Sequence, residues 1–351
     1  MFTKITEQQN SIIMARSYQT KYNLHIDTLS ACYDSQEGFY KWLLDTTAYN
    51  PLPSLDPKEK ERKTYTAIIE INPTLYLQFT RSKEDKEPHE LKASMYFANN
   101  YFCGTWLFTN SKLYSKRAWF TASNFMLYHE IPTWGSEAGL EYPATLIDLI
   151  EMVAEHFNLT FHNITDLHLA LDTNKNVERA VRSMLTDCEN FDLYLRGQQI
   201  TDENEIFENV FECARRSRKR IYKPSLTIQN EGVRVQCYDK SFEQETQGNN
   251  KPYIAEVNGF KNMHRIEVRM RNKDFEKVFN RYLRMTERER KKEFNKMGLE
   301  FKPCTMSDVN VLRMLENPQV LTFMWRYLTD KTIYFADKEG NVITLYDLAT
   351  I

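Results

Sequence analysis

The segment VRVQCYD, Val233–Asp239, decides the fold class, because apolar and polar residues alternate along it. Successive side chains of an extended strand point to opposite faces of a sheet. One face of this strand is therefore apolar, and the other carries Arg234, Gln236 and Tyr238. Asp239 would point to the apolar side if the strand continued. From this pattern alone, Tyr238 is either a half-buried aromatic residue or a catalytic residue whose hydroxyl group is accessible to a substrate.

Two other segments show the same period of two: DLHLALD, Asp166–Asp172, and HRIEVRMR, His264–Arg271. Strands with one apolar and one polar side are typical of an antiparallel sheet whose apolar face is covered. Such a polar face is commonly a wet surface with paired charges. The same residue types are also those that phosphodiester chemistry requires, and both interpretations stay open. If the three segments are neighbours, the side chains that meet on this face are Tyr238, Glu267, Asp172, His168, Arg265 and Arg269.

The remaining segments complete an α+β pattern. Strand-like runs dominate the first 160 residues, and apolar spacing predicts a helix from Pro143 to Asn158. Further helices are predicted over residues 176–188, 274–297 and 309–328, followed by a terminal hairpin. We predict an antiparallel sheet with helices on one face, made of two related halves. The expected divisions are 1–160, a strand-rich half; 161–298, the half with the polar-faced strands; and 299–351, a helix-hairpin extension.

Composition limits the class of protein. The chain has 351 residues, of which 42% are apolar, enough for one large domain or two ordinary ones. A formal net charge of -2 excludes a uniformly basic nucleic-acid binder but leaves a local basic patch open. The six cysteines form no Cys-x-x-Cys pair, which disfavours zinc and favours a reducing compartment. Without a signal-like beginning or an apolar run of roughly 20 residues, we expect a cytoplasmic protein.

The order of these motifs resembles the replication initiation factor family, which comprises rolling-circle Rep proteins of plasmids and phages and the related relaxases of mobile elements. That family has a strand R-x-D-x-A-x-D, a strand ending in Tyr-Asp/Glu-Lys with a nearby glutamate, and then R-x-E-x-R. The counterparts here are DLHLALD, CYDKSFEQ (Cys237–Gln244) and RIEVR (Arg265–Arg269). IDTLSACY also resembles the family's first strand. The likeness covers roughly residues 20–285.

The first motif departs from the family pattern. Asp166 and His168 stand where the family has its arginine and its first aspartate. If the family's metal site uses that aspartate, His168 would have to replace it. The sequence Asn230-Glu231-Gly232 also stands where a glycine-serine pair is expected before the tyrosine strand. An inactive relative is therefore one of the open alternatives.

The resemblance implies a Rep-like or relaxase-like fold and a metal-dependent tyrosine DNA nicking-closing endonuclease that initiates rolling-circle replication. Tyr238 would attack a scissile phosphate in single-stranded or cruciform origin DNA, leaving a phosphotyrosine and a free 3′-hydroxyl. Lys240 would assist the leaving group. Further expected partners are a host helicase and a second copy of the chain in a homodimer, whereas no membrane is expected.

The implied chemistry requires a cation. A phenol with a pKa of about 10 is a poor nucleophile at neutral pH, so Mg²⁺ or Mn²⁺ would be needed to polarise the phosphate. Such hard ions prefer oxygen ligands, sometimes with one imidazole. Glu267, Asp172 and His168 are the expected ligands. Arg265 and Arg269 would hold the phosphate or its developing charge.

The segment RRSRKRIYK, Arg215–Lys223, packs six cations into nine residues. Such a run is usually a solvated surface, but because the rest of the chain is slightly acidic we favour contact with backbone phosphates. Three alternatives stay open: a relaxase that nicks an origin of transfer, a non-catalytic nucleic-acid-binding protein, and a structural protein whose wet face does no chemistry. The residues expected to bind DNA are Arg215, Arg216, Arg218, Lys219, Arg220, Lys223 and Arg234.

Overall fold

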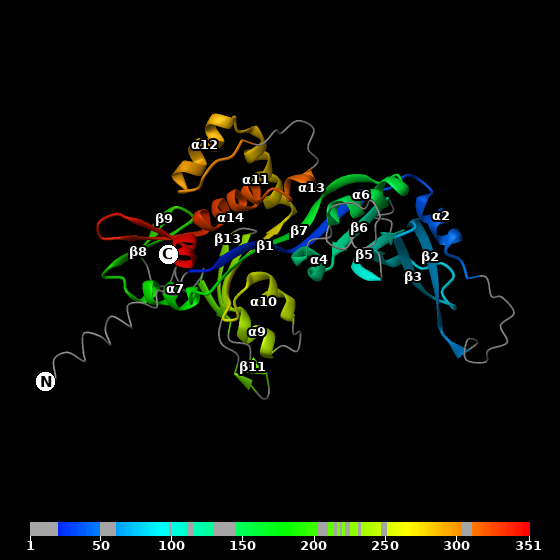
Figure 1. The fold of residues 1–351 in the computed structure, drawn as a ribbon, viewed down its shortest axis with the longest axis horizontal. Coiled ribbons are helices and arrows are strands. Elements are labelled where there is room, and N and C mark those ends of the chain that lie inside the picture. Colours follow the sequence, from blue (N-terminus) through cyan, green and yellow to red (C-terminus); the bar gives the residue numbers. More distant parts are fainter. Residues whose placement is uncertain are drawn as a thin grey trace.

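One continuous antiparallel sheet of 11 strands runs through the protein, with helices packed against it (Figure 1). No helix in the described residues is long and apolar enough to cross a membrane. The computed structural model describes residues 20–49, 61–97, 100–110, 116–129, 145–201, 210–213, 216–217, 220–221, 225–230, 233–246, 251–303 and 311–351.

The first half of the chain supplies one end of this sheet. Buried and more exposed residues alternate along its strands, as in Leu75–Ser82, so each strand has one covered face. The elements are β1 (Tyr22–Asp34), α2 (Phe39–Thr46), β2 (Thr64–Asn72), β3 (Leu75–Ser82), β4 (Glu90–Phe97), β5 (Tyr101–Thr109), β6 (Arg117–Ala122), α4 (Asn124–Tyr128) and α6 (Leu146–His156).

The second half supplies the other end of the sheet. Its elements are β7 (Thr160–Thr173), α7 (Val177–Thr186), β8 (Phe191–Leu195), β9 (Gln198–Ile200), β10 (Val210–Cys213), β11 (Arg216–Ser217), β12 (Arg220–Ile221), β13 (Ser225–Asn230), β14 (Val233–Asp239), α9 (Lys240–Thr246), α10 (Pro252–Asn258), β15 (His264–Arg271), α11 (Asn272–Arg284) and α12 (Glu287–Lys296). The last elements are α13 (Val311–Met314), α14 (Pro318–Thr332), β16 (Ile333–Asp337), β17 (Val342–Thr344) and α15 (Leu345–Thr350). A small second sheet has the order β17-β16-β8-β9.

The order of the strands shows two related halves. In the first half, β1 pairs with β6, and β5, β4, β3 and β2 follow outward to one edge. In the second half, β7 pairs with β15, and β14, β13 and β10 follow outward to the other edge. β1 and β7 pair with each other at the centre of the sheet. The predicted α+β class, with an antiparallel sheet of two related halves, is confirmed.

One hydrophobic core joins both halves and the C-terminal segment. It packs the apolar face of the sheet against helices that include α6, α11 and α14, and it includes Leu169, Val153, Phe279 and Trp325. Helices therefore cover the apolar face, as predicted. The short helices α4 and α10 lie on the polar face, around a small separate cluster of Tyr128, Ile254 and Met263. The expected boundaries at residues 160 and 298 stay a prediction.

Two of the predicted helices are divided in the structure. Residues 274–297 contribute to α11 and α12, because Thr286 begins a new helix with a capping box. Residues 309–328 contribute to α13 and α14, because Asn317 caps a helix that starts at Pro318.

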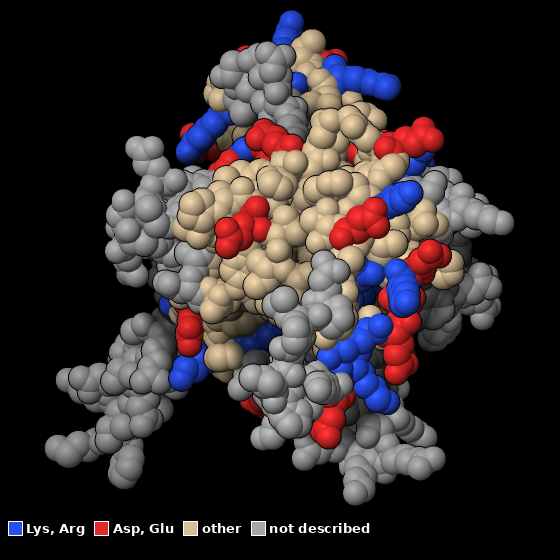
Figure 2. Space-filling view, turned by 90° about the vertical axis from the view of Figure 1, so that its right-hand side faces the viewer, with Lys and Arg blue, Asp and Glu red and all other residues tan. Residues whose placement is uncertain are grey.

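The end of the molecule formed by α2 and the outer strands carries both signs of charge on its described surface (Figure 2). Acidic and basic side chains are intermingled there, and some are paired. Lys116 Nζ lies 3.6 Å from Glu37 Oε2, and Arg117 Nε lies 3.0 Å from Asp34 Oδ1.

Candidate active site

The three polar-faced strands are neighbours in the order β14-β15-β7. Tyr238 lies opposite Arg265, and Arg265 lies opposite Asp172 on its other side. Further along the same strands, Arg269 lies opposite His168. These residues share one face of the sheet, as the alternation predicts.

Tyr238 is held by a hydrogen bond across the sheet. Its phenol donates to Glu267 Oε2 over 2.8 Å, and the residue keeps part of its surface exposed. Lys240, at the start of α9, places Nζ 5.7 Å from the centre of the Tyr238 ring and 2.6 Å from Glu243 Oε2. Burial of the phenol and the negative charge of Glu267 raise the pKa of Tyr238 well above its ordinary value. The hydroxyl thus faces polar groups and holds its proton in this state.

Glu267 is the centre of this polar group, and its side chain is only 2% exposed. Its Oε1 lies 3.0 Å from His168 Nδ1 and accepts a hydrogen bond of 2.9 Å from Arg269 Nε. Burial opposes ionisation of this carboxyl group, but the hydrogen bond from His168 and the charge of Arg269 lower its pKa to about 2. Burial also opposes protonation of His168, but its hydrogen bonds with Asp166 and Glu267 raise its pKa to about 9. The result is an imidazolium held between two carboxylates.

Asp27 joins this group from β1. The pairing of β1 with β7 shifts register between Ile26 and Thr28, so Asp27 lies in a bulge, where the alternation of the strand is interrupted. Ligand atoms of Asp27, His168 and Glu267 all lie within 4.8 Å of one another. Two carboxylates and one imidazole are a donor set that Mg²⁺ or Mn²⁺ accepts. The side chains therefore fit such an ion, provided that His168 gives up the proton it shares with Glu267.

Asp172 is not part of that group. Its carboxylate accepts two hydrogen bonds from Arg265, of 2.6 and 2.8 Å, and one of 2.8 Å from Asn258. Both Asp172 and Arg265 are fully buried. The expected ligand Asp172 is therefore engaged in a buried ion pair, and Asp27 occupies the place beside His168 and Glu267.

Arg265 links three elements of the fold. Besides Asp172, it binds Asp27 Oδ1 through Nη1 and the phenol oxygen of Tyr128 through Nη2, each over 2.7 Å. Burial opposes its charge, but Asp172 and its other acidic neighbours raise the pKa of Arg265 well above its ordinary value. Burial likewise opposes ionisation of Asp27, and Arg265 lowers the pKa of that carboxyl group. A phosphate at Arg265, as the sequence suggests, would have to displace these contacts, and the geometry instead gives Arg265 a role in positioning Asp27.

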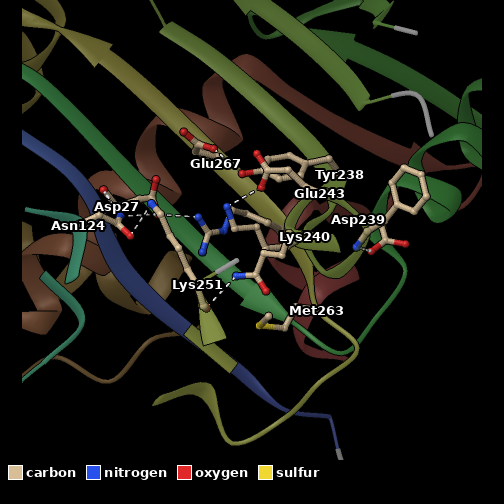
Figure 3. A network of polar contacts seen from close by, with 12 residues as sticks. Asp27, Asn124, Tyr238, Asp239, Lys240, Glu243, Lys251, Met263 and Glu267 are labelled. Atoms are coloured by element: carbon tan, nitrogen blue, oxygen red, sulfur yellow. Dashed lines mark hydrogen bonds and ion pairs between the residues drawn. The ribbon is translucent and has the colours of Figure 1, made fainter. Parts of the chain in front are cut away.

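A second lysine lies near the group on the polar face. Lys251, just before α10, donates to Asn124 Oδ1 over 2.9 Å, and Asn124 donates to Asp27 Oδ1 over 3.2 Å. Figure 3 shows Asp27 and Asn124 on one side of this network and Tyr238 on the other, with Lys240 and Lys251 between them. The site thus combines a phenol, an ion-binding group and two cationic side chains.

Sequence reasoning missed several residues of this network. Asp27 belongs to IDTLSACY, the segment that resembles a first strand of the Rep family. Its place in that strand could have indicated that Asp27 belongs to the site. No local pattern distinguishes the others, because α4 and α10 bring them to the site from distant parts of the chain. These residues are Asn124, Tyr128, Lys251 and Asn258.

The residues expected to bind DNA are only partly described. Arg234 is exposed on β14 and lies opposite Arg269, so two cations are adjacent on the polar face. The backbones of Arg216 and Arg220 lie in the paired strands β11 and β12. The other four expected residues lie outside the described residues: Arg215, Arg218, Lys219 and Lys223.

No model of a known protein family matches the sequence, and no curated protein matches it significantly. Among solved structures, the fold is similar to that of a rolling circle replication initiator protein from Geobacillus stearothermophilus, with 11% sequence identity and a TM-score of 0.35. The similarity covers 89% of this chain and 97% of that one. At this level the likeness is too distant to assign a site or an activity.

Proposed function

We propose that this protein is a replication initiator that nicks origin DNA through Tyr238. The observation that carries the proposal is the hydrogen bond from the Tyr238 phenol to Glu267, a member of the group that can hold a divalent cation. The ordered motifs around Asp172, Tyr238 and Glu267 support the same assignment. The substrate is single-stranded or cruciform DNA, and the product is a phosphotyrosine with a free 3′-hydroxyl.

In the proposed reaction, Tyr238 Oη forms a bond to phosphorus while the bond from phosphorus to the 3′-oxygen breaks. The phenol proton passes to solvent water, while Glu267 Oε2, which accepts its hydrogen bond, orients the hydroxyl. The leaving 3′-oxygen takes a proton from Lys240, whose ammonium group lies beside the Tyr238 ring. Lys240 is 7% exposed, so its charge is little screened by water.

Asp27, His168 and Glu267 would hold the cation in this proposal. A bound Mg²⁺ or Mn²⁺ would supply Lewis acidity to a phosphate oxygen and favour loss of the phenol proton. The chain's own contribution is to fix these ligands. Arg265 holds Asp27 in place from inside the protein, and Arg269 holds Glu267 from the surface.

The path of the DNA would follow the polar face away from Tyr238. Arg269 and Arg234 lie side by side on neighbouring strands in that direction. The side chain of Arg269 is 40% exposed, so a phosphate can reach it. Contacts of this kind supply affinity and orientation, while the sequence of the origin is read elsewhere.

The test is adduct formation with oligonucleotides from the protein's own replicon in the presence of Mn²⁺. Tyr238→Phe should abolish the covalent adduct and leave DNA affinity unchanged. The matched control is Tyr253→Phe, because Tyr253 also lies on the polar face and donates to Asn124 Oδ1 over 2.7 Å. An adduct that persists in Tyr238→Phe would assign the nucleophile to another residue. If the unmodified protein binds DNA but never forms an adduct, it is a non-catalytic binding protein.

A further inference from the structure

The helix α10 is fixed on the polar face of the sheet at both of its ends. At its start, Lys251 Nζ and Tyr253 Oη donate to Asn124 Oδ1 over 2.9 and 2.7 Å. At its end, Asn258 Nδ2 donates to Asp172 Oδ2 over 2.8 Å. These contacts give Lys251, the residue just before the helix, a defined position beside the candidate active site.

Asn124 connects Lys251 to the ion-binding group. Its amide nitrogen donates to the backbone oxygen of Asp27 over 2.7 Å and to Oδ1 of the same residue over 3.2 Å. A side-chain amide carries its donor and its acceptor on different atoms, so these bonds turn the amide oxygen toward the lysine. Figure 3 shows the side chain of Lys251 extending toward Asn124 and Asp27. The ammonium group is thus two hydrogen bonds away from a ligand of the proposed cation.

Lys251 is the less compensated of the two lysines at this site. Lys240 Nζ lies 2.6 Å from Glu243 Oε2, whereas no carboxylate among the residues that the structure describes forms an ion pair with Lys251. The hydrogen bond to Asn124 goes to a neutral amide and uses one of the three N–H donors of the ammonium group. Burial lowers the pKa of Lys251 and outweighs the attraction of the carboxylates nearby. A half-buried cation with donors to spare is suited to bind an anion.

We propose that Lys251 binds the phosphate that Tyr238 attacks, with its ammonium group on a non-bridging oxygen. This inference rests on the proposed function. Lys251 keeps its proton in this role and contributes charge alone, since Lys240 supplies the proton that the leaving 3′-oxygen takes. A positive charge held in place beforehand stabilises the negative charge that builds up on the phosphate oxygens.

The first test measures DNA binding by the full-length Tyr238→Phe protein, so that no adduct forms through Tyr238. Single-stranded origin oligonucleotides carry one uncharged methylphosphonate linkage, placed at each position in turn. We expect one linkage whose neutralisation weakens binding at least about fivefold in this protein and has no effect once Lys251→Met is added. The matched control is Lys338→Met, because the ammonium group of Lys338 already lies 2.8 Å from Asp192 Oδ1. In the control, the same linkage should keep its full effect.

The coupled linkage should also be the one that the protein with an intact Tyr238 cleaves. Coupling of Lys251 to no linkage, or to a linkage other than the cleaved one, would overturn the proposal. If Lys251 is coupled to one linkage but the unmodified protein never forms an adduct, the contact with DNA stands and the proposed nicking fails.

Two further measurements separate this role from a structural one. At saturating DNA, Lys251→Met should slow adduct formation at least about tenfold, and Lys251→Arg, which keeps the charge, should slow it less. The Tm of Lys251→Met should not fall, because the substitution removes a half-buried cation that lacks a carboxylate partner. A lower Tm together with unchanged DNA binding would assign Lys251 a structural role and overturn the proposal.

Discussion

Tyr238 and Glu267 are 29 residues apart in the chain, yet the phenol of one donates a 2.8 Å hydrogen bond to the carboxylate of the other. The same carboxylate contacts His168 and Arg269 through its second oxygen. One almost fully buried acid therefore connects the tyrosine to the ion-binding group. Substitutions around it should separate chemistry from folding.

Asp27 and Asp172 should respond differently to loss of their charge. Asp27→Asn is expected to weaken binding of Mn²⁺ to its group at least about tenfold, because it removes a direct ligand. Asp172→Asn should change that affinity little, since Asp172 is bound to Arg265 and Asn258. Titration calorimetry of each variant with Mn²⁺ provides the measurement. The reverse order of affinities would restore Asp172 as the ligand.

Arg265 should matter chiefly for stability. Arg265→Met leaves Asp172 and Asp27 without their guanidinium partner, and removal of one member of a buried ion pair costs about 3–5 kcal/mol. Urea denaturation should show this decrease in the free energy of unfolding. The exposed Arg234→Met is the control and should change stability by about 0.5 kcal/mol or less. Equal effects of the two substitutions would refute the assigned role of Arg265.

Gly104 should not tolerate a side chain. A Cβ at this position of β5 would lie 2.5 Å from both Phe120 Cζ and the carbonyl oxygen of Thr121 on β6. The backbone oxygen cannot move aside without disturbing the strand pair, so Gly104→Ala should destabilise the protein by about 1–3 kcal/mol. Thermal unfolding measures the effect, and Thr66→Ala on the exposed side of β2 is the control. A Gly104→Ala protein as stable as the control would contradict this packing.

The basic segment Arg215–Lys223 should govern the salt dependence of DNA binding. For single-stranded DNA, the slope of log K against log salt should become shallower by about 0.7 for each phosphate that the protein no longer neutralises. The double substitution Arg218→Ala and Lys219→Ala should thus reduce the magnitude of this negative slope by about 1.4 if both residues bind phosphate. Fluorescence anisotropy over a series of salt concentrations provides the measurement. A slope equal to that of the parent would show that these residues are merely solvated.

The sheet and much of its polar face could be predicted from sequence, because period-two alternation is a local property. It places Tyr238, Glu267 and His168 on one face, and their strands prove to be neighbours. Alternation could not reveal Asp27, because a bulge interrupts it there. Nor could alternation show that Asp172 forms an ion pair with Arg265, because the two residues are 93 positions apart in the chain.

The helix boundaries are set by capping residues, which the spacing of apolar residues does not reveal. The start of α12 is marked by Thr286 and Glu289, a Thr-x-x-Glu capping box that is visible in the sequence. The helices α9 and α10 were not predicted, since their few apolar residues form no extended stripe. Their place is set by long-range contacts, such as the hydrogen bond from Asn258 to Asp172.

The most direct test of the central claim is to locate the protein–DNA bond. The protein is incubated with Mn²⁺ and a single-stranded oligonucleotide of its own origin, digested, and examined by tandem mass spectrometry. We predict a nucleotide attached through a phosphodiester to the Tyr238 phenol and a DNA product with a free 3′-hydroxyl. A nucleotide found on any other residue, or DNA cleaved without a protein adduct, would contradict the proposed mechanism.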